Sequence, residues 1–299
     1  MAQATFPLIP RRRVIGLAFG SMRSARRGLG SDVASSRPYR PGDRIDAIDW
    51  AASARLSLAR NADEFVAREH YAEESPRALV VADRRPSLAI GPPPERRLRK
   101  AEALEYAVGL IAASAVSARS LLGYLDYAEG RPFWQPPRSE HQQAAPGHRG
   151  FGAPEGSLAQ ALAFLEYQRG DLPTGTFVFV VSDFLEPLDR RAWGRMLERR
   201  WDVVPVVIQD PIWERTFPKV EGLVVRFADP RTGEVAGVRL GWREAAQLRE
   251  ANERRWSALL ADFRSVGLEP IVVGSHEPAE ISGAFLRWAD ERIYVRGHS

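Results

Sequence analysis

Short apolar runs alternate with helix-like segments from residue 77 to the end of the chain. Continuous runs such as 78–82 and 176–181 are typical of strands buried on both faces of a sheet. In 95–118 the apolar residues instead recur every three or four positions, which predicts a helix. Strand and helix in alternation predict an α/β fold, a mostly parallel, Rossmann-type sheet with helices on both faces.

The same pattern predicts the remaining elements of this region. Residues 131–134 are expected to pair with strand 121–127, and 135–154, rich in Pro, Gly, Gln and His, to form a mobile loop. The turn sequence at 229–233, between two apolar runs, indicates a β-hairpin inserted at about 221–241. Further strands are expected at 203–208 and 270–273, and further helices at 157–167, 187–200, 243–266 and 278–289.

Residues 1 to about 36 show no sustained period. In residues 1–13 the charges follow the apolar residues, the reverse of a secretory signal, and we expect a frayed tail. Pro41-Gly42 is a strong turn signal, and Ile48 and Trp50 supply apolar anchors after it. We therefore expect two parts: an N-terminal extension of β and turn structure, residues 1–76, and an α/β domain, residues 77–299.

The composition excludes several classes of chemistry. The chain has no cysteine, which rules out disulfides and thiolate sites and fits a reducing cytoplasm. The most apolar helical stretch carries Glu102 and Glu105 and is shorter than the roughly 20 residues of a membrane span. The 42 basic residues, all arginine except Lys100 and Lys219, nearly balance 38 acidic ones. Their clusters are short and lack interleaved aromatics, so nucleic-acid binding is not favoured.

Two aspartates are the main candidates for chemistry. Asp83 and Asp183 each end a predicted buried strand, and the carboxyl edge of an open parallel sheet is where ligands bind. Three hydroxyls lie nearby in sequence: Ser87 is four residues past Asp83, Ser182 precedes Asp183, and Ser157 begins the helix before that strand. Carboxylates with hydroxyls suit Mg²⁺. As alternatives, Ser157 and Asp183 serve only as helix caps. Dinucleotide, phosphate-loop and nucleophile-elbow motifs are absent, and the five histidines lack ligand spacing.

The order of these residues resembles the von Willebrand factor A fold. That family binds a metal ion through Asp-x-Ser-x-Ser, a distant Thr and a later Asp. Here the first element reads Asp83-Arg84-Arg85-Pro86-Ser87, so Arg85 replaces the middle serine, and Ser157 takes the place of the threonine. A guanidinium has no lone pair for a cation. We therefore hypothesise a degenerate metal site in which Arg85 stands in for the ion.

A second resemblance, from about residue 28 onward, is to the bacterial "domain of unknown function 58" family. Its signature here comprises Arg37, Tyr39, Pro41, Gly42, Asp43, Asp49, Trp50 and Arg55. Members carry this signature just ahead of a von Willebrand factor A-like domain. Physically, the turn reverses the chain, Ile48 and Trp50 bury apolar area, and Asp49 pairs with Arg55 or Arg37. The alternative is that the signature forms a docking surface.

The family resemblance implies a partner, because such genes commonly accompany MoxR-type AAA+ ATPases in chaperone-like maturation or assembly of other proteins. The first hypothesis is thus a cytoplasmic, non-enzymatic adaptor without a cofactor, whose sheet edge offers Arg84, Arg85 and Asp183 as a polar contact surface for the ATPase or a client protein. The alternative is a metal-dependent binding module or hydrolase using Asp83 and Asp183 with Mg²⁺ or Mn²⁺. A two-metal hydrolase normally needs more carboxylates than these.

Overall fold

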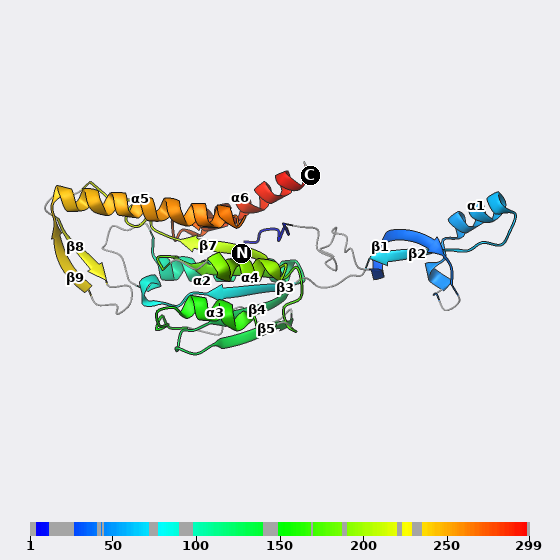
Figure 1. Cartoon of the computed structure of the whole chain (residues 1–299), viewed down its shortest axis with the longest axis horizontal. Helices are drawn as coiled ribbons and strands as arrows, with labels where there is room; N and C mark the ends of the chain where they lie inside the picture. The colour runs from blue at the N-terminus through cyan, green and yellow to red at the C-terminus, as the bar shows by residue number, and fades with distance from the viewer. Residues whose placement is uncertain are drawn as a thin grey trace. The chain divides into compact units, whose positions relative to one another are not determined.

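The chain forms two compact units, which we describe separately. The α/β unit comprises residues 1–11 and 77–299, and the signature unit comprises residues 12–76. Figure 1 shows both units, coloured from blue at the N-terminus to red at the C-terminus. The computed structural model describes residues 4–11, 27–40, 43, 45–71, 77–89, 98–139, 149–168, 170–186, 190–219, 223–228 and 235–297.

The α/β unit is built on a six-stranded sheet in the order β10-β7-β6-β3-β4-β5. Five strands run parallel and β5 runs antiparallel at the edge. The prediction of a mixed α/β fold with a mostly parallel central sheet is therefore confirmed. The strands are β3 (Arg77–Ala82), β4 (Leu121–Asp126), β5 (Phe133–Ser139), β6 (Phe177–Ser182), β7 (Asp202–Ile208) and β10 (Ile271–Val273).

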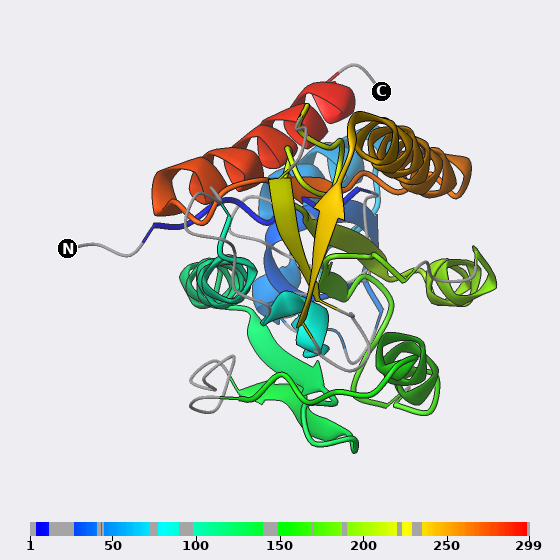
Figure 2. The same cartoon turned by 90° about the vertical axis from the view of Figure 1, so that its left-hand side faces the viewer.

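Helices cover both faces of this sheet (Figure 2). Successive side chains of a strand point to opposite faces, so β6 divides its residues between two cores. Val178 and Val180 pack with α3, α4 and α5, whereas Phe179 contacts Trp288 of α6. Helix α2 lies beside α6 on this second face. The helices are α2 (Lys100–Ser117), α3 (Ser157–Leu165), α4 (Arg190–Glu198), α5 (Trp242–Ser265) and α6 (Pro278–Gly297).

The inserted hairpin agrees with the sequence pattern, whereas the edge strand β5 extends into a predicted loop. The inserted hairpin is present as β8 (Leu223–Ala228) and β9 (Val235–Leu240), and its turn lies outside the described residues. The mobile loop expected at 135–154 is wrong at its start, because β5 continues through Ser139 in antiparallel register with β4. Two prolines in that stretch suggested a loop, but an edge strand tolerates proline because one side needs no partner.

Residues 4–11 are not a frayed tail, contrary to the prediction. Phe6 and Leu8 are buried, and Phe6 sits among the rings of Phe179, Phe285 and Trp288. Figure 2 shows the segment in dark blue beside α6. These residues therefore belong to the core of the α/β unit although they precede the signature unit in the chain.

The signature unit contains an antiparallel pair, β1 (Arg27–Pro38) and β2 (Val66–Tyr71), joined by a short 3₁₀ turn at Ile45–Ala47 and helix α1 (Trp50–Arg60). The sequence pattern did not reveal α1, because its apolar residues do not form one stripe. The local signals were present: Asp49 accepts a hydrogen bond from the amide of Ala52 as the N-cap, and Asn61 ends the helix in the left-handed region.

Among the described residues, no helix is both long and apolar enough to cross a membrane.

Candidate functional site

The two aspartates lie at the carboxyl ends of adjacent parallel strands. Asp83 directly follows β3 and Asp183 directly follows β6, and these strands pair in register from Ala78 to Ala82. The chain runs from β3 outward to β4 and β5, then returns to β6 on the other side of β3. The aspartates therefore occupy the switch point of the sheet, where open α/β folds place their ligands.

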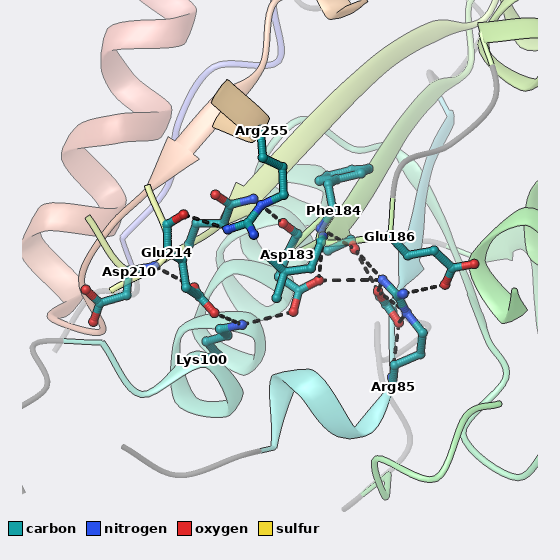
Figure 3. Close-up of polar contacts among 12 residues, drawn as sticks. Arg85, Lys100, Asp183, Phe184, Glu186, Asp210, Glu214 and Arg255 are labelled. Atoms are coloured by element: carbon teal, nitrogen blue, oxygen red, sulfur yellow. Dashed lines mark hydrogen bonds and ion pairs between the residues drawn. The ribbon is translucent and has the colours of Figure 1, made fainter. Parts of the chain in front are cut away.

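Arg85 fills the space between these carboxylates (Figure 3). Its guanidinium nitrogen Nη2 lies 2.6 Å from Asp83 Oδ2 and 3.5 Å from Asp183 Oδ1. Nε donates to both oxygens of Asp83, and Nη1 pairs with Glu186. The backbone amide of Arg85 also donates to Asp83 Oδ1 at 3.0 Å. The arginine is thus held by three acidic side chains from two loops.

Lys100, the first residue of α2, neutralises Asp183 from the other side. Its Nζ lies 2.9 Å from Asp183 Oδ2 and 2.5 Å from Glu214 Oε1, so it bridges two carboxylates (Figure 3). Residue Lys100 is 6% exposed and Asp183 is 0% exposed, which makes this a buried ion pair. One signal in the sequence could have indicated this pair, because Lys100 is one of only two lysines among 42 basic residues.

The buried charges keep each other ionised. Burial lowers the pKa of Lys100, but Asp183 and Glu214 outweigh it and hold that pKa above its ordinary value. Burial likewise raises the pKa of Asp183, but Lys100 and then Arg85 bring it below its ordinary value. For Arg85, the carboxylates of Asp83 and Asp183 overcome burial and raise the guanidinium pKa. Arg85, Lys100 and Asp183 are therefore charged at neutral pH.

A second layer ties this network to the rest of the sheet edge. The side-chain amide of Gln209, after β7, donates to the backbone carbonyl of Asp183 at 2.6 Å. Glu214 accepts from the backbone amide of Asp210, and its own carbonyl accepts from Arg255 on α5. The ends of β3, β6 and β7 and the helices α2 and α5 are consequently linked through Asp183, Lys100 and Glu214.

Arg84 forms a separate buried cluster. Its Nη2 donates to Tyr124 Oη at 3.0 Å, and Nη1 pairs with Glu105 of α2. The residue is 1% exposed and Arg85 is 6% exposed. The Arg84 side chain is fully buried, the Arg85 side chain is 8% exposed, and Asp183 is also buried. The expected polar contact surface of Arg84, Arg85 and Asp183 is therefore wrong for this conformation.

The hydroxyls are arranged differently from the sequence expectation. Ser182 lies next to the aspartates, and its Oγ donates to Asp83 Oδ2 at 2.6 Å. Among the described residues, Ser87 Oγ is buried without a hydrogen-bond partner. Ser157 is buried as the first residue of α3, and Gly156 occupies the N-cap position. The Asp183 carboxylate accepts from the amide of Leu185 within its own loop.

These donors do not fit a divalent cation as they stand. The oxygens of Asp83 face Arg85 and Ser182, and those of Asp183 face Lys100 and the amide of Leu185. Two cations already lie where an ion would need to bind its carboxylates. No group of three or more His, Cys, Asp or Glu in the described part of the chain is arranged to hold a metal.

Two of the signature residues, Arg37 and Tyr39, contact Asp43. Arg37 pairs with its carboxylate through both terminal nitrogens, at 2.8 and 2.7 Å, and Tyr39 Oη donates to its backbone carbonyl. Arg55 donates to the carbonyl of Ala51 within α1. The Arg37–Asp43 pair thus fixes the start of the loop before α1. Pro41 and Gly42 lie outside the described residues.

Trp50 contradicts the interpretation of the signature as a buried anchor. It is 60% exposed and touches Phe65 edge-on, with ring centroids 6.1 Å apart. Trp50 is the first residue of α1, directly after the N-cap Asp49. Of the eleven residues of α1, all described, Ser53 alone is buried. The expectation that Trp50 buries apolar area is therefore wrong.

Replacing Arg37 with glutamine is expected to raise the pKa of Asp43. The Arg37 hydrogen bonds, followed by the Arg40 amide, lower that pKa from 3.8 to about 2. A lowered carboxyl pKa stabilises the fold above pH 3.8, and this contribution is lost as the pH falls from there towards 2. Carboxyl-carbon NMR titration measures the shift. Arg60→Gln, which removes another surface pair of the same unit, should leave Asp43 unchanged.

A family model described as "Protein of unknown function DUF58" matches residues 35–258, and the chain therefore belongs to that family. The match covers most of the signature unit and the sheet edge with Asp83, Asp183 and Lys100. No curated protein matches the chain closely.

Proposed function

We propose that this member of the family is a non-enzymatic adaptor with a von Willebrand factor A-like α/β unit, working in the cytoplasm with a MoxR-type AAA+ ATPase on client proteins. The α/β unit supports the fold assignment through its switch point, which combines Asp83 and Asp183 from adjacent strands. The partner rests on the family resemblance, and the structure bears on how the adaptor would meet it.

The observation that carries this proposal is the neutralised switch point. Arg85 pairs with Asp83, and Lys100 pairs with Asp183. An enzyme would need these carboxylates free to bind a metal ion or to transfer a proton. All four side chains are buried, so no reacting group faces an open site there. A hydrolase using Asp83 and Asp183 would need both cations to leave. The arrangement instead favours a rigid frame that presents other surfaces to partners.

The signature unit supplies the surface best suited to a protein partner. Trp50 and Phe65 are exposed side by side, and Ile45 and Leu58 are 72% and 85% exposed. Exposed tryptophan is enriched among residues that dominate binding energy at protein interfaces. Because α1 buries only Ser53, its apolar side chains have little cover within their own unit. We assign this surface to the AAA+ ATPase.

Trp50→Ala is expected to abolish co-purification with the AAA+ ATPase encoded nearest this gene and any stimulation of its ATP turnover. An interface tryptophan typically contributes at least about 2 kcal/mol to binding, a loss of roughly thirtyfold in affinity. Tagged full-length chain and purified ATPase give the measurement. The matched control is Trp242→Ala, which removes a tryptophan of 62% exposure from the α/β unit and should bind normally.

Two outcomes would contradict the proposal. If the unaltered chain neither binds such an ATPase nor changes its turnover, the adaptor function fails. If both tryptophan variants bind equally well, the adaptor function survives but the assignment of the signature surface is wrong. Turnover of a phosphoester panel with Mn²⁺ by the purified chain, lost on replacement of Asp83, would favour the hydrolase alternative.

A further inference from the structure

Residues 4–11, Ala-Thr-Phe-Pro-Leu-Ile-Pro-Arg, lie in the α/β unit as an extended segment that we call the strap. Its even-numbered residues from Phe6 to Pro10 are buried, and Thr5 and Pro7 are exposed. Alternation of this kind is the pattern of a peptide lying across a surface. Pro7 and Pro10 hold the backbone extended and have no amide that needs a partner.

The apolar half of the strap fits a pocket of aromatic rings. Phe6 lies 4.8 Å from Phe285, 5.9 Å from Trp288 and 6.1 Å from Phe179, measured between ring centroids. Two of these contacts are edge-to-face, the geometry that aromatic pairs prefer. Leu8 is 3% exposed two residues later. A large apolar residue is therefore required at each of these two positions.

Side chains of the α/β unit also bind the backbone of the strap. Ser114 Oγ of α2 accepts from the amide of Phe6 at 3.0 Å, and Arg292 of α6 donates to the carbonyl of Ile9 at 2.9 Å. Asp202 accepts from the amide of Arg11 at 2.7 Å. Asp202 and Arg292 pair with each other and are almost fully buried. Hydrogen bonds to main-chain groups give affinity for an extended peptide, and those from charged groups are the stronger ones.

The last strap residue makes a specific contact of its own. The Arg11 guanidinium donates to the backbone carbonyl of Gly267, just after the end of α5, where a cation is favoured by the helix dipole. Gly267 has a positive φ of 71°, and an added Cβ would come within 3.0 Å of this guanidinium. The strap thus ends in a basic residue held at a helix terminus.

We propose that the surface formed by Ser114, Phe179, Asp202, Phe285, Trp288 and Arg292 is a peptide-binding site that the strap occupies in cis. Its ligand in trans is an extended segment of a partner protein with the pattern aromatic-Pro-aliphatic-x-Pro-Arg. The strap then acts as an internal competitor, and its release opens the site. This site lies on the α2 and α6 face and is independent of the adaptor function proposed above.

The test uses a fluorescent peptide of residues 4–11 and the full-length chain. A tethered segment competes at an effective concentration on the order of millimolar, so the unaltered chain should exclude the peptide. A chain carrying Phe6→Ala and Leu8→Ala has a weakened strap and should bind the peptide at least about tenfold more tightly. A peptide with Phe6→Ala should not bind. Thr5→Ala changes an exposed strap residue, and that chain should behave like the unaltered one.

Equal peptide binding by the weakened-strap chain and the unaltered chain would overturn the proposal, as would equal binding of the two peptides. Circular dichroism establishes whether the weakened-strap chain is folded. If it is not, hydrogen exchange of the unaltered chain is measured with excess unlabelled peptide. Faster exchange at the amides of Phe6 and Arg11 would show displacement and support the site. Unchanged exchange at saturating peptide would rule it out.

Discussion

Lys100→Met is expected to lower the free energy of unfolding by about 3–5 kcal/mol, because removing one partner of a buried ion pair leaves the other charge uncompensated. Asp183 is fully buried, and Lys100 provides its shortest ion pair at 2.9 Å. Glu214 loses the same partner. Methionine keeps the length of the aliphatic stem, so the change isolates the charge. Equilibrium urea denaturation measures the loss.

The neighbouring residue offers a matched control. Arg99 pairs with Glu102 on the surface, with side chains 59% and 55% exposed. Exposed pairs typically contribute about 0–1 kcal/mol, so Arg99→Met should have little effect on unfolding. A second comparison uses Asp183→Asn together with Lys100→Met. Because this double change removes both charges of the pair, it should cost less than the sum of the two single changes.

The pH dependence gives an independent check on the same pair. The pKa of Lys100 is raised in the folded state, so its contribution to stability is complete below pH 10.5 and is lost as the pH rises through the folded pKa. The pKa of Asp183 is lowered, so its contribution is complete above pH 3.8 and is lost on acidification. Lys100→Met should flatten the alkaline limb. Equal stability of Lys100→Met and Arg99→Met would show that the pair does not hold the sheet edge together.

The pattern of the α/β unit was readable because buried parallel strands leave a strong local signal. Runs such as 78–82 and 176–181 located β3 and β6, and the residue after each strand identified Asp83 and Asp183. The structure shows that these two strands are neighbours in the sheet, although β4 and β5 lie between them in the chain. Edge strands carry a weaker signal, since only one side is paired, and β5 was partly mistaken for a loop.

The partners of the aspartates could not be read in the same way. Lys100 lies 83 residues before Asp183, and Glu214 lies 31 residues after it in a loop. No local pattern links residues so far apart, because their meeting depends on how α2 crosses the sheet. The same applies to Phe6, whose neighbours in the core come from β6 and α6. Without that tertiary information, an N-terminal segment with prolines resembled a frayed tail.

The exposure of Trp50 in the signature unit could not be predicted from the sequence for a different reason. Trp50 was expected to be buried because tryptophan is apolar, but exposure depends on which surface a helix turns towards its neighbours. In α1 the residue that docks against β2 is Ser53, whose hydroxyl accepts from the amide of Val66 at 2.9 Å. A polar side chain thus makes the helix–strand contact and the tryptophan faces outward. Hydropathy alone gives the opposite orientation.

Arg85→Ser is expected to create a divalent-cation site that the unaltered chain lacks. The change removes a guanidinium that lies 2.6 Å from Asp83 and 3.5 Å from Asp183. Two unit charges about 4 Å apart interact by about 4 kcal/mol near a protein surface, so loss of this cation should favour Mn²⁺ by at least a hundredfold. The serine hydroxyl would add an oxygen ligand beside Asp83 and Ser87. Calorimetric titration with Mn²⁺ and Mg²⁺ measures the gain.

The adjacent Arg84 provides the control, because it shows whether removal of any buried arginine creates a cation site or only removal of Arg85. Arg84→Ser deletes another buried guanidinium, but one that faces Tyr124 and Glu105. It should gain no cation binding. Asp83→Asn added to Arg85→Ser should abolish the gain, because it removes a carboxylate ligand. Circular dichroism of each variant shows whether the chain remains folded before any titration is interpreted.

Comparison with the unaltered chain then decides whether Arg85 replaces a metal ion or only cross-links two loops. If it binds no Mn²⁺ and Arg85→Ser does, the arginine occupies a place that still has the geometry of a metal site, and it substitutes for the ion. If neither binds although both are folded, the arginine is a structural cross-link between the loops after β3 and β6, and Lys100 alone suffices to block a cation from Asp183. If the unaltered chain binds Mg²⁺ at micromolar concentration and Asp83→Ala loses it, the cation displaces Arg85, and the metal-free adaptor proposed here is wrong.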